Sequence, residues 1–179
     1  MGLDISPQGI EIAKHNALRA GIRNVDFRCM SFSDLRWDEQ FDTILCLAFL
    51  HHVPEGEVTD LLKQAFAHLT PDGFFYSQDP NRNGVLRHLG RFIFGTRLDT
   101  YHSPDERELL PCELAQQLKA TGFRAVTIRH IDFTLIPALF ILAKRVSWPL
   151  YICRVLDFLW CHSLLAHWSS GFVAIARKS

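Results

Sequence analysis

The sequence predicts an α/β domain with a doubly wound, mostly parallel sheet. Short apolar segments alternate with amphipathic segments of helical period along residues 2–132. Residues 41–48 are apolar almost throughout, as expected for a strand that is covered on both faces. Connections between parallel strands are right-handed crossovers, which place helices on the faces of the sheet.

The first elements expected are a strand end, a helix and a second strand. Residues 2–5 have the character of a strand that is finishing. Ser6 and Pro7 are a typical helix start, because the serine caps the helix and proline lacks an N–H that would go unpaired. Gly21 is expected to end this helix, and residues 24–30 alternate apolar and polar side chains as a strand does.

The remaining elements follow the same alternation. Helices are expected over residues 55–69 and 112–121, and the long connection 79–110 carries a helical apolar face of its own. Residues 70–73 have the composition of a turn. Three further strands are expected, over residues 74–78, 124–132 and 171–177.

Composition narrows the function classes. Lys+Arg and Asp+Glu both number 19, so the chain has no basic field for general nucleic-acid binding. The five cysteines include no CxxC pair, and no signal peptide is recognised. These features predict reduced thiols and a cytoplasmic protein. No metal site is predicted, since Cys161, His162 and His167 do not match a zinc-ligand spacing.

The strongly apolar segment 134–168 precedes the last expected strand. Its aromatic residues alternate with basic ones, and its longest apolar run is too short to cross a bilayer. One interpretation is an apolar helical insertion in peripheral contact with a membrane, at its inner face, or covering a lipophilic ligand. The other is an insertion that packs on the core or on a partner subunit.

Asp4 is the first candidate for ligand binding. It follows a strand and precedes a helix, and ligands of open α/β sheets bind outside the carboxyl ends of the strands. An acid at this place can accept hydrogen bonds from both ribose hydroxyls of a nucleoside. Alternatively, Asp4 only stabilises the positive end of the following helix.

Four segments, taken together, resemble the class I S-adenosylmethionine-dependent methyltransferases of the small-molecule type. They are Gly-Leu-Asp-Ile-Ser from residue 2, Asn-Val-Asp-Phe-Arg-Cys-Met-Ser-Phe-Ser-Asp-Leu from residue 24, Phe-Asp-Thr-Ile-Leu-Cys-Leu-Ala-Phe-Leu-His-His-Val from residue 41, and Leu-Thr-Pro-Asp-Gly-Phe-Phe from residue 69. They occur in the order and at the spacing of that family. The resemblance implies a Rossmann-like sheet with an antiparallel C-terminal strand, in a single domain over residues 1–179.

The resemblance also implies the cofactor, S-adenosyl-L-methionine, and the residues that bind it. By this similarity Asp4 binds the ribose, and Ile5 lies against the adenine. The turn that frames the adenine edge is Met30, Ser31 and Phe32, although many relatives have an aspartate in place of Ser31. Cys46 and Leu47 match the strand end that faces the methionine portion and the substrate.

Three residues are the catalytic candidates. His51 and His52 follow the fourth strand of the family pattern, and a histidine beside a small-molecule acceptor can act as general base. The alternative is that one histidine caps the next helix and packs on the core. Asp79, like Asn81, follows the next strand and is a candidate for holding the acceptor, or only a turn residue.

The family's glycine-rich cofactor loop belongs to a first strand that precedes Asp4, and no GxGxxG motif occurs in the chain. That strand lies between the second and fourth strands of the family's sheet, so the sheet is expected to lack it. We therefore expect an N-terminally truncated domain whose family activity is methyl transfer. The alternative is a noncatalytic fragment or pseudoenzyme that binds a membrane or a protein. A nucleotide-sugar or nicotinamide enzyme would require the same loop.

Overall fold

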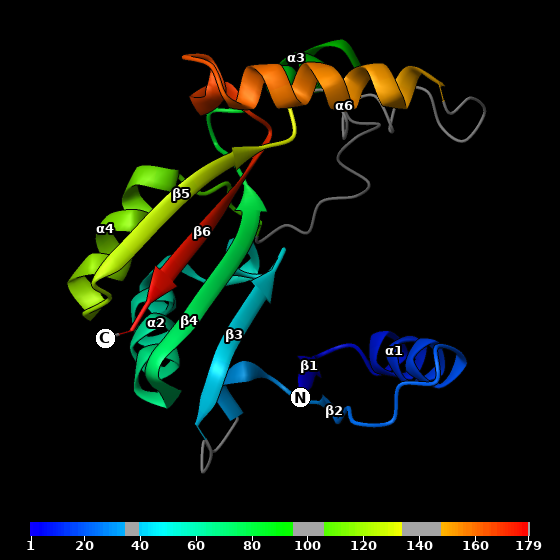
Figure 1. Cartoon of the computed structure of the whole chain (residues 1–179), viewed down its shortest axis with the longest axis vertical. Helices are drawn as coiled ribbons and strands as arrows, with labels where there is room; N and C mark the ends of the chain where they lie inside the picture. The colour runs from blue at the N-terminus through cyan, green and yellow to red at the C-terminus, as the bar shows by residue number, and fades with distance from the viewer. Residues whose placement is uncertain (35–39, 95–105, 134–147, 179) are drawn as a thin grey trace. The chain divides into compact units, whose positions relative to one another are not determined.

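The computed structural model describes residues 1–34, 40–94, 106–133 and 148–178. The chain consists of two compact units, Met1–Glu39 and Gln40–Ser179, each described by itself below. Figure 1 shows the helices and strands of both units along the chain. We refer to them as the N-terminal unit and the C-terminal unit.

The N-terminal unit is a strand–helix–strand motif. Strand β1 (Gly2–Asp4) pairs in parallel with β2 (Phe27–Cys29), and helix α1 (Pro7–Arg19) connects them. The predicted helix start is confirmed, because the Ser6 hydroxyl accepts a hydrogen bond of 3.1 Å from the Gly9 N–H. The predicted end is confirmed by the left-handed conformation of Gly21, at φ 70°.

The C-terminal unit contains a four-stranded mixed sheet in the order β3-β4-β6-β5. Strand β3 (Phe41–Leu47) runs parallel to β4 (Leu69–Pro80). The last strand, β6 (Gly171–Arg177), is antiparallel both to β4 and to β5 (Ala125–Ile131). The predicted antiparallel C-terminal strand is therefore confirmed.

Two helices of the C-terminal unit, α2 (Glu55–His68) and α4 (Pro111–Thr121), lie on the same side of this sheet (Figure 1). Beneath them the core is built from fully buried aromatic and aliphatic side chains, including Phe75, Leu62 and Leu118. Large apolar side chains on the other face of the strands, Leu45 and Leu47 of β3 among them, remain exposed.

The strands form two sheets. Strands β1 and β2 form one sheet and β3 to β6 another, and within the described residues no ladder joins the two sheets. By the family resemblance, β1 and β3 correspond to the family's second and fourth strands. The predicted fold class, a Rossmann-like α/β fold with a mostly parallel sheet and an antiparallel last strand, agrees with this arrangement.

One boundary differs from the prediction. Residues 70–73, expected as a turn, lie within the assigned strand β4, because Phe41 already pairs with Leu69. The register then shifts between Phe41 and Thr43, and Asp72 has φ 64°. The turn chemistry of Asp72 and Gly73 therefore appears as an irregularity of the strand and not as a separate loop.

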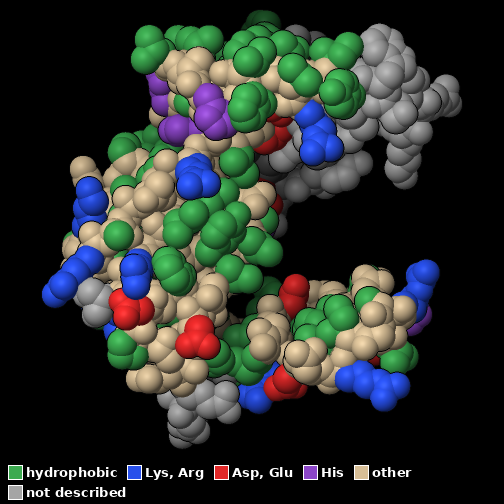
Figure 2. All heavy atoms as spheres, in the orientation of Figure 1, with side chains coloured by type: hydrophobic (Ala, Val, Ile, Leu, Met, Phe, Trp, Pro, Cys, Tyr) green, Lys and Arg blue, Asp and Glu red, His purple; other side chains and the backbone are tan. Residues whose placement is uncertain are grey.

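Helix α3 (Val85–Phe94) confirms the helix expected within the long connection. The described part of the segment 134–168 contains α6 (Trp148–Cys161) and a short 3-10 turn, η5 (Ala166–Trp168). Lys144 and Arg145, two of its basic residues, lie outside the described residues. Figure 2 shows hydrophobic side chains along α6, at the top of the view. Over the described part of the chain, no helix is both long enough and apolar enough to cross a membrane.

Candidate functional site

The C-terminal unit gathers its candidate catalytic residues at the carboxyl ends of β3 and β4. After β3 the chain turns at Ala48, whose φ of 47° is unusual for a residue with a side chain. The Ala48 N–H donates a hydrogen bond of 2.8 Å to the Gln78 carbonyl, which holds this turn against β4. The 3-10 turn η2 (Leu50–His52) follows immediately and carries both histidines.

His51 and Asp79 form a buried pair. The His51 Nδ1 lies 3.1 Å from the Asp79 Oδ1, and the side chains are 8% and 0% exposed. The same carboxylate oxygen also accepts a hydrogen bond of 3.3 Å from the His51 backbone N–H. A carboxylate on Nδ1 fixes the ring orientation and favours the tautomer in which Nδ1 carries the proton. The nitrogen Nε2 is then the acceptor.

His52 has a different environment, on the exposed side of the same turn. Its side chain is 41% exposed, and Nε2 lies 3.7 Å from the Glu106 Oε1. The two histidine rings are close, with centroids 4.0 Å apart. Neither histidine provides a side-chain cap for α2, whose N-cap is Pro54. The capping interpretation of these histidines is therefore wrong.

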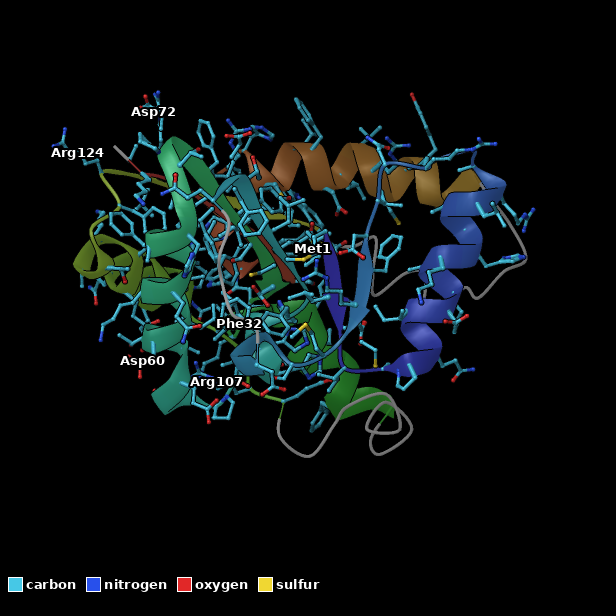
Figure 3. The ribbon with its side chains drawn as sticks, turned by 90° about the horizontal axis from the view of Figure 1, so that it is seen from below. Met1, Phe32, Asp60, Asp72, Arg107 and Arg124 are labelled. Carbon is cyan, nitrogen blue, oxygen red and sulfur yellow. The ribbon has the colours of Figure 1, made fainter. Side chains whose placement is uncertain are left out.

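A distant segment completes the cluster. Residues 106–109 come well after β3 and β4 in the sequence and do not directly continue either strand. The Arg107 N–H nevertheless donates a hydrogen bond of 3.0 Å to the His51 carbonyl. The Arg107 guanidinium Nη1 lies 3.6 Å from the Glu55 Oε1 at the start of α2. Figure 3 labels Arg107 on this segment. The neighbouring Glu106 lies beside His52, as the distance between their side chains shows. The sequence analysis missed Glu106 because no local pattern links it to His52.

Several polar atoms near the pair are buried with no hydrogen-bond partner in the described residues. They are the Asp79 Oδ2, the Ser77 Oγ and the Arg107 Nε. Ser77 pairs with Cys46 in the β3–β4 register, and Ser77 lies two residues before Asp79, on the same face of β4. Unpaired buried polar atoms are costly, so their concentration at one strand end indicates a functional place in the fold.

Cys46 contributes backbone to this region, but its side chain is buried. Burial, together with the smaller effect of the negative charge of Asp79, raises the pKa of its thiol from 9.0 to about 12. The Cys46 thiol is therefore neutral and unreactive. Leu47 is 59% exposed, so its side chain is accessible to a ligand.

Asn81 has a structural position. Its side chain is fully buried, and its Nδ2 donates hydrogen bonds of 3.0 and 2.8 Å to the carbonyls of His167 and Ser169. Its Oδ1 accepts a hydrogen bond from the Asn83 N–H. The amide thus joins the end of β4 to the segment before β6, and we do not retain Asn81 as a residue that holds the acceptor.

The N-terminal unit carries its own group of candidate residues at the carboxyl ends of β1 and β2. The Asp4 carbonyl accepts a hydrogen bond of 3.0 Å from the Met30 N–H, so the two strand ends are adjacent. The Asp4 Oδ1 accepts one of 2.8 Å from the Ser6 N–H. The next side chain, Ile5, is 76% exposed.

The turn after β2 is closed by serine hydroxyls. Ser31 precedes the 3-10 turn η1 (Phe32–Asp34), and its Oγ lies 2.8 Å from the Ser33 Oγ. The same Ser31 oxygen accepts a hydrogen bond of 3.3 Å from the Ser33 N–H. The hydroxyl at the position where many relatives have an aspartate therefore caps a turn.

Comparison with known proteins agrees with this arrangement. A family model described as a methyltransferase domain matches residues 1–73. A ubiquinone biosynthesis O-methyltransferase of Bordetella bronchiseptica is 26% identical over 160 residues, which cover 82% of this chain and 61% of the relative. The family-model match and this relative support the resemblance of the chain to the class I S-adenosylmethionine-dependent methyltransferases.

Two further similarities agree with this resemblance. A ubiquinone biosynthesis O-methyltransferase of Coxiella burnetii is 28% identical over 152 residues, covering 82% of this chain and 63% of the relative. The crystal structure of a SAM-dependent methyltransferase from Archaeoglobus fulgidus superposes with a TM-score of 0.63 at 18% identity, covering 99% of this chain and 75% of that one. The structural similarity shows the fold, and the chain spans about three fifths of the curated relatives it matches.

Proposed function

We propose that this methyltransferase transfers a methyl group from S-adenosylmethionine to an oxygen atom of a small, lipophilic acceptor. The observation that carries the proposal is the buried His51–Asp79 pair at the carboxyl ends of β3 and β4. Ligands of open α/β sheets bind at this end of the strands. The names of two relatives, which are O-methyltransferases of ubiquinone biosynthesis, support an oxygen acceptor and a lipophilic one.

The residues of the N-terminal unit fit the nucleoside part of the cofactor. The Ser6 N–H fixes the orientation of the Asp4 carboxylate, which is exposed and suited to accept hydrogen bonds from ribose hydroxyls. Gly9 leaves room beside it, since a Cβ atom there would lie 3.3 Å from the Asp4 Oδ2. Ile5 offers an exposed apolar surface for an adenine ring. We propose that Met30, Ser31 and Phe32 frame the ring and that Cys46 and Leu47 line the methionine side.

When bound, S-adenosylmethionine supplies an electrophilic methyl carbon on a positively charged sulfur. The His51 Nε2 then takes the proton of an acceptor hydroxyl, while Nδ1–H remains hydrogen-bonded to Asp79. An electron pair of the acceptor oxygen forms the new bond to carbon, and the pair of the broken carbon–sulfur bond stays on sulfur. The Asp79 carboxylate stabilises the imidazolium that forms, as general base catalysis requires. His52 binds on the exposed side of the acceptor.

Cofactor binding is the first test. Calorimetric titration of the chain with S-adenosylhomocysteine is expected to show binding in the micromolar range. Asp4→Asn should weaken it at least about tenfold, because a hydrogen bond to a charged group contributes roughly 1.5–3 kcal/mol. Asp26→Asn is the matched control, an exposed acid of the same unit that is paired with Arg28 at 2.7 Å. No binding by the wild-type chain would favour the alternative, a noncatalytic binding module.

The base has its own test. His51→Gln removes the proton acceptor, and general base catalysis typically contributes about 10²–10⁴-fold to the rate. We expect a loss of that size in kcat for a phenolic acceptor, with unchanged affinity for S-adenosylhomocysteine. His68→Gln, at the far end of α2, serves as the control. Unchanged kcat in His51→Gln would show that alignment alone accounts for the transfer.

We also propose that α6 makes peripheral contact with a membrane that holds the acceptor. Five of its apolar side chains recur at helical spacing and are exposed: Tyr151, Ile152, Val155, Phe158 and Leu159. Replacing Tyr151 and Phe158, which are 72% and 65% exposed, by serine should reduce co-sedimentation with anionic liposomes severalfold. Replacing Leu45 and Leu47 of β3 by serine is the control for general loss of apolar surface. Equal pelleting of wild type and the α6 variant would exclude this surface.

A further inference from the structure

The residues His51, His52 and Glu106 form a cluster with the donor set of a transition-metal site. One possible ligand atom from each of the three residues lies within 4.8 Å of the others. Among the described residues, this is the group of three that could hold a metal ion. The His52 Nε2 and the Glu106 Oε1 are 3.7 Å apart. Ligand atoms around one metal ion at about 2.1 Å are separated by slightly less than this, so the His52–Glu106 pair needs only a small contraction, whereas the His51 ring has to approach by up to about 1 Å.

The buried carboxylate of Asp79 prepares His51 for metal binding. Because Asp79 holds the Nδ1 of His51 at 3.1 Å, Nε2 is the nitrogen left to bind an ion. A histidine that binds a metal almost always donates its other N–H to a carboxylate, a carbonyl or water, which orients the ring and makes the ligand more basic. The other carboxylate oxygen of Asp79, Oδ2, is buried and has no hydrogen-bond partner in the described part of the chain.

The third proposed ligand, Glu106, belongs to a segment that is held by backbone hydrogen bonds. The Arg107 N–H binds the His51 carbonyl, and the Arg82 N–H binds the Leu109 carbonyl, both at 3.0 Å. The residues that follow Glu106 are thereby tied to the turn of His51 and to the end of β4. Glu106 therefore reaches His52 from a fixed backbone, as a preorganised ligand does.

The charges around the cluster favour a divalent cation. The carboxylates of Asp79, Glu106 and Glu55 lie around the two histidines, and the guanidinium of Arg107 is the described cation among them. A cation bound here would be attracted by these carboxylates.

We propose that His51 Nε2, His52 and Glu106 bind a divalent transition-metal ion of the Zn²⁺ type. Two histidines and one glutamate are the ligands of one class of catalytic zinc sites, which keep a further position open. Imidazole ligands favour such ions over Mg²⁺. The open position suits the oxygen of an acceptor, whose hydroxyl the ion would make more acidic. This role rests on the proposed function and would replace proton uptake by the His51 Nε2, because one nitrogen lone pair cannot bind a metal ion and a proton together. The binding of the ion itself does not rest on the proposed function.

The test is a calorimetric titration of the full chain with ZnCl₂, repeated with MgCl₂. We expect one Zn²⁺ per chain at this site and much weaker binding of Mg²⁺. Glu106→Gln and His52→Gln should each weaken Zn²⁺ binding at least about tenfold, and Asp79→Asn about 10–100-fold through His51. Glu108→Gln is the matched control, because Glu108 lies on the same segment and its Oε2 is 4.0 Å from the His88 Nε2. It should bind Zn²⁺ as the wild type does.

Two outcomes would overturn the proposal: unchanged Zn²⁺ affinity in both Glu106→Gln and His52→Gln, or the absence of Zn²⁺ binding by a folded wild-type chain. Cobalt substitution guards against misfolded variants, since Co²⁺ bound by histidine and carboxylate absorbs visible light and reports the ligands directly. Titration with S-adenosylhomocysteine separates the two proposals. If the chain binds Zn²⁺ but not S-adenosylhomocysteine, the metal site is retained and the methyltransferase activity of the chain is rejected. If it binds S-adenosylhomocysteine but not Zn²⁺, the proposed function is retained and the metal site is rejected.

Discussion

Each of the two units has an aspartate at the carboxyl end of a parallel strand, Asp4 in β1 and Asp79 in β4. The two aspartates have opposite environments. Asp4 follows β1 in the N-terminal unit, where it is exposed and its Oδ1 binds the Ser6 N–H. Asp79 is the penultimate residue of β4 in the C-terminal unit, where its side chain is 0% exposed and binds His51. The local pattern is similar, so burial decides the role. An exposed carboxylate can bind ligand hydroxyls directly, whereas a buried one acts through the neighbour that it orients.

The same contrast between buried and exposed copies of one residue type can be tested elsewhere in the chain. The largest effect is expected for the cysteines. Cys46 is buried and its thiol pKa is raised from 9.0 to about 12, whereas Cys29 is exposed. At pH 8 such a shift lowers the thiolate fraction about a thousandfold, so Cys29 should react with iodoacetamide and Cys46 should not. Mass spectrometry of the modified peptides measures both rates.

The raised pKa of Cys46 also predicts a dependence of stability on pH. The folded chain holds this proton more tightly than the unfolded chain. The resulting stabilisation is therefore complete below pH 9 and is lost as the pH rises from 9 toward 12. Urea unfolding between pH 8 and 10.5, compared with Cys46→Ala, isolates this contribution. Equal alkylation of Cys29 and Cys46 in the folded protein would contradict both expectations.

Two adjacent phenylalanines of β4 provide the next test. Phe75 is 0% exposed beneath the helices and lies 5.9 Å from the ring of Phe123, whereas Phe74 is 42% exposed on the opposite face. Phe75→Ala should lower the free energy of unfolding by about 3–5 kcal/mol, since it removes a buried ring and leaves a cavity. Phe74→Ala should cost less than half as much. Equal losses would mean that the exposed face of β4 is covered in solution.

The two glycines that follow helices α1 and α4 are a third pair. Gly122 has φ 118°, and a Cβ atom there would lie 3.1 Å from the Phe66 ring. Gly21 has φ 70°, with no atom within 4 Å of such a Cβ. Gly122→Ala should destabilise the fold by about 1–3 kcal/mol through strain and crowding. Gly21→Ala should cost about 1–2 kcal/mol, from the backbone conformation alone. Thermal unfolding of both variants ranks them, and the reverse order would refute the argument.

The smallest effect is expected at a helix start. The Ser6 hydroxyl caps α1 by accepting the Gly9 N–H, and α2 begins at Pro54 without such a cap. Ser6→Ala should weaken α1 by about 0.5–2 kcal/mol, and Ser6→Asp should restore most of the loss. Hydrogen exchange of the amides of α1 reports the local change. Unchanged exchange in Ser6→Ala would show that the cap contributes nothing.

Much of the architecture could be predicted because its causes are local. Ser6 and Pro7 start a helix and Gly21 follows the end of that helix, and both predictions are confirmed. The apolar run 41–48 forms the expected strand β3, but the expectation that both faces are covered is wrong, because Leu45 and Leu47 are 60% and 59% exposed. The irregular start of β4 was not predicted. Residues 70–73 have turn chemistry, but the pairing of Phe41 with Leu69 extends the strand through them. Pairing between segments far apart in the sequence overrides local preference.

The candidate site divides along the same line. His51, His52 and Asp79 could be selected from the sequence because each follows a strand at the end of the sheet where ligands bind. The sequence alone did not distinguish a base, a cap and a turn residue among them. Glu106 and the unpartnered Asp79 Oδ2 had no signal in the sequence, since the separation from His52 to Glu106 is bridged only by the folded chain.

By itself, then, the sequence determined the order of strands and helices, the resemblance to a methyltransferase family and the position of Asp4 at a strand end, because periodicity, caps and strand ends depend on neighbouring residues. Only the tertiary structure decided that His51 is buried against Asp79 and that His52 meets Glu106. Burial and ligand geometry are properties of segments brought together from distant parts of the chain. For that reason the sequence predicted no metal ion, and the folded C-terminal unit presents three residues able to bind one.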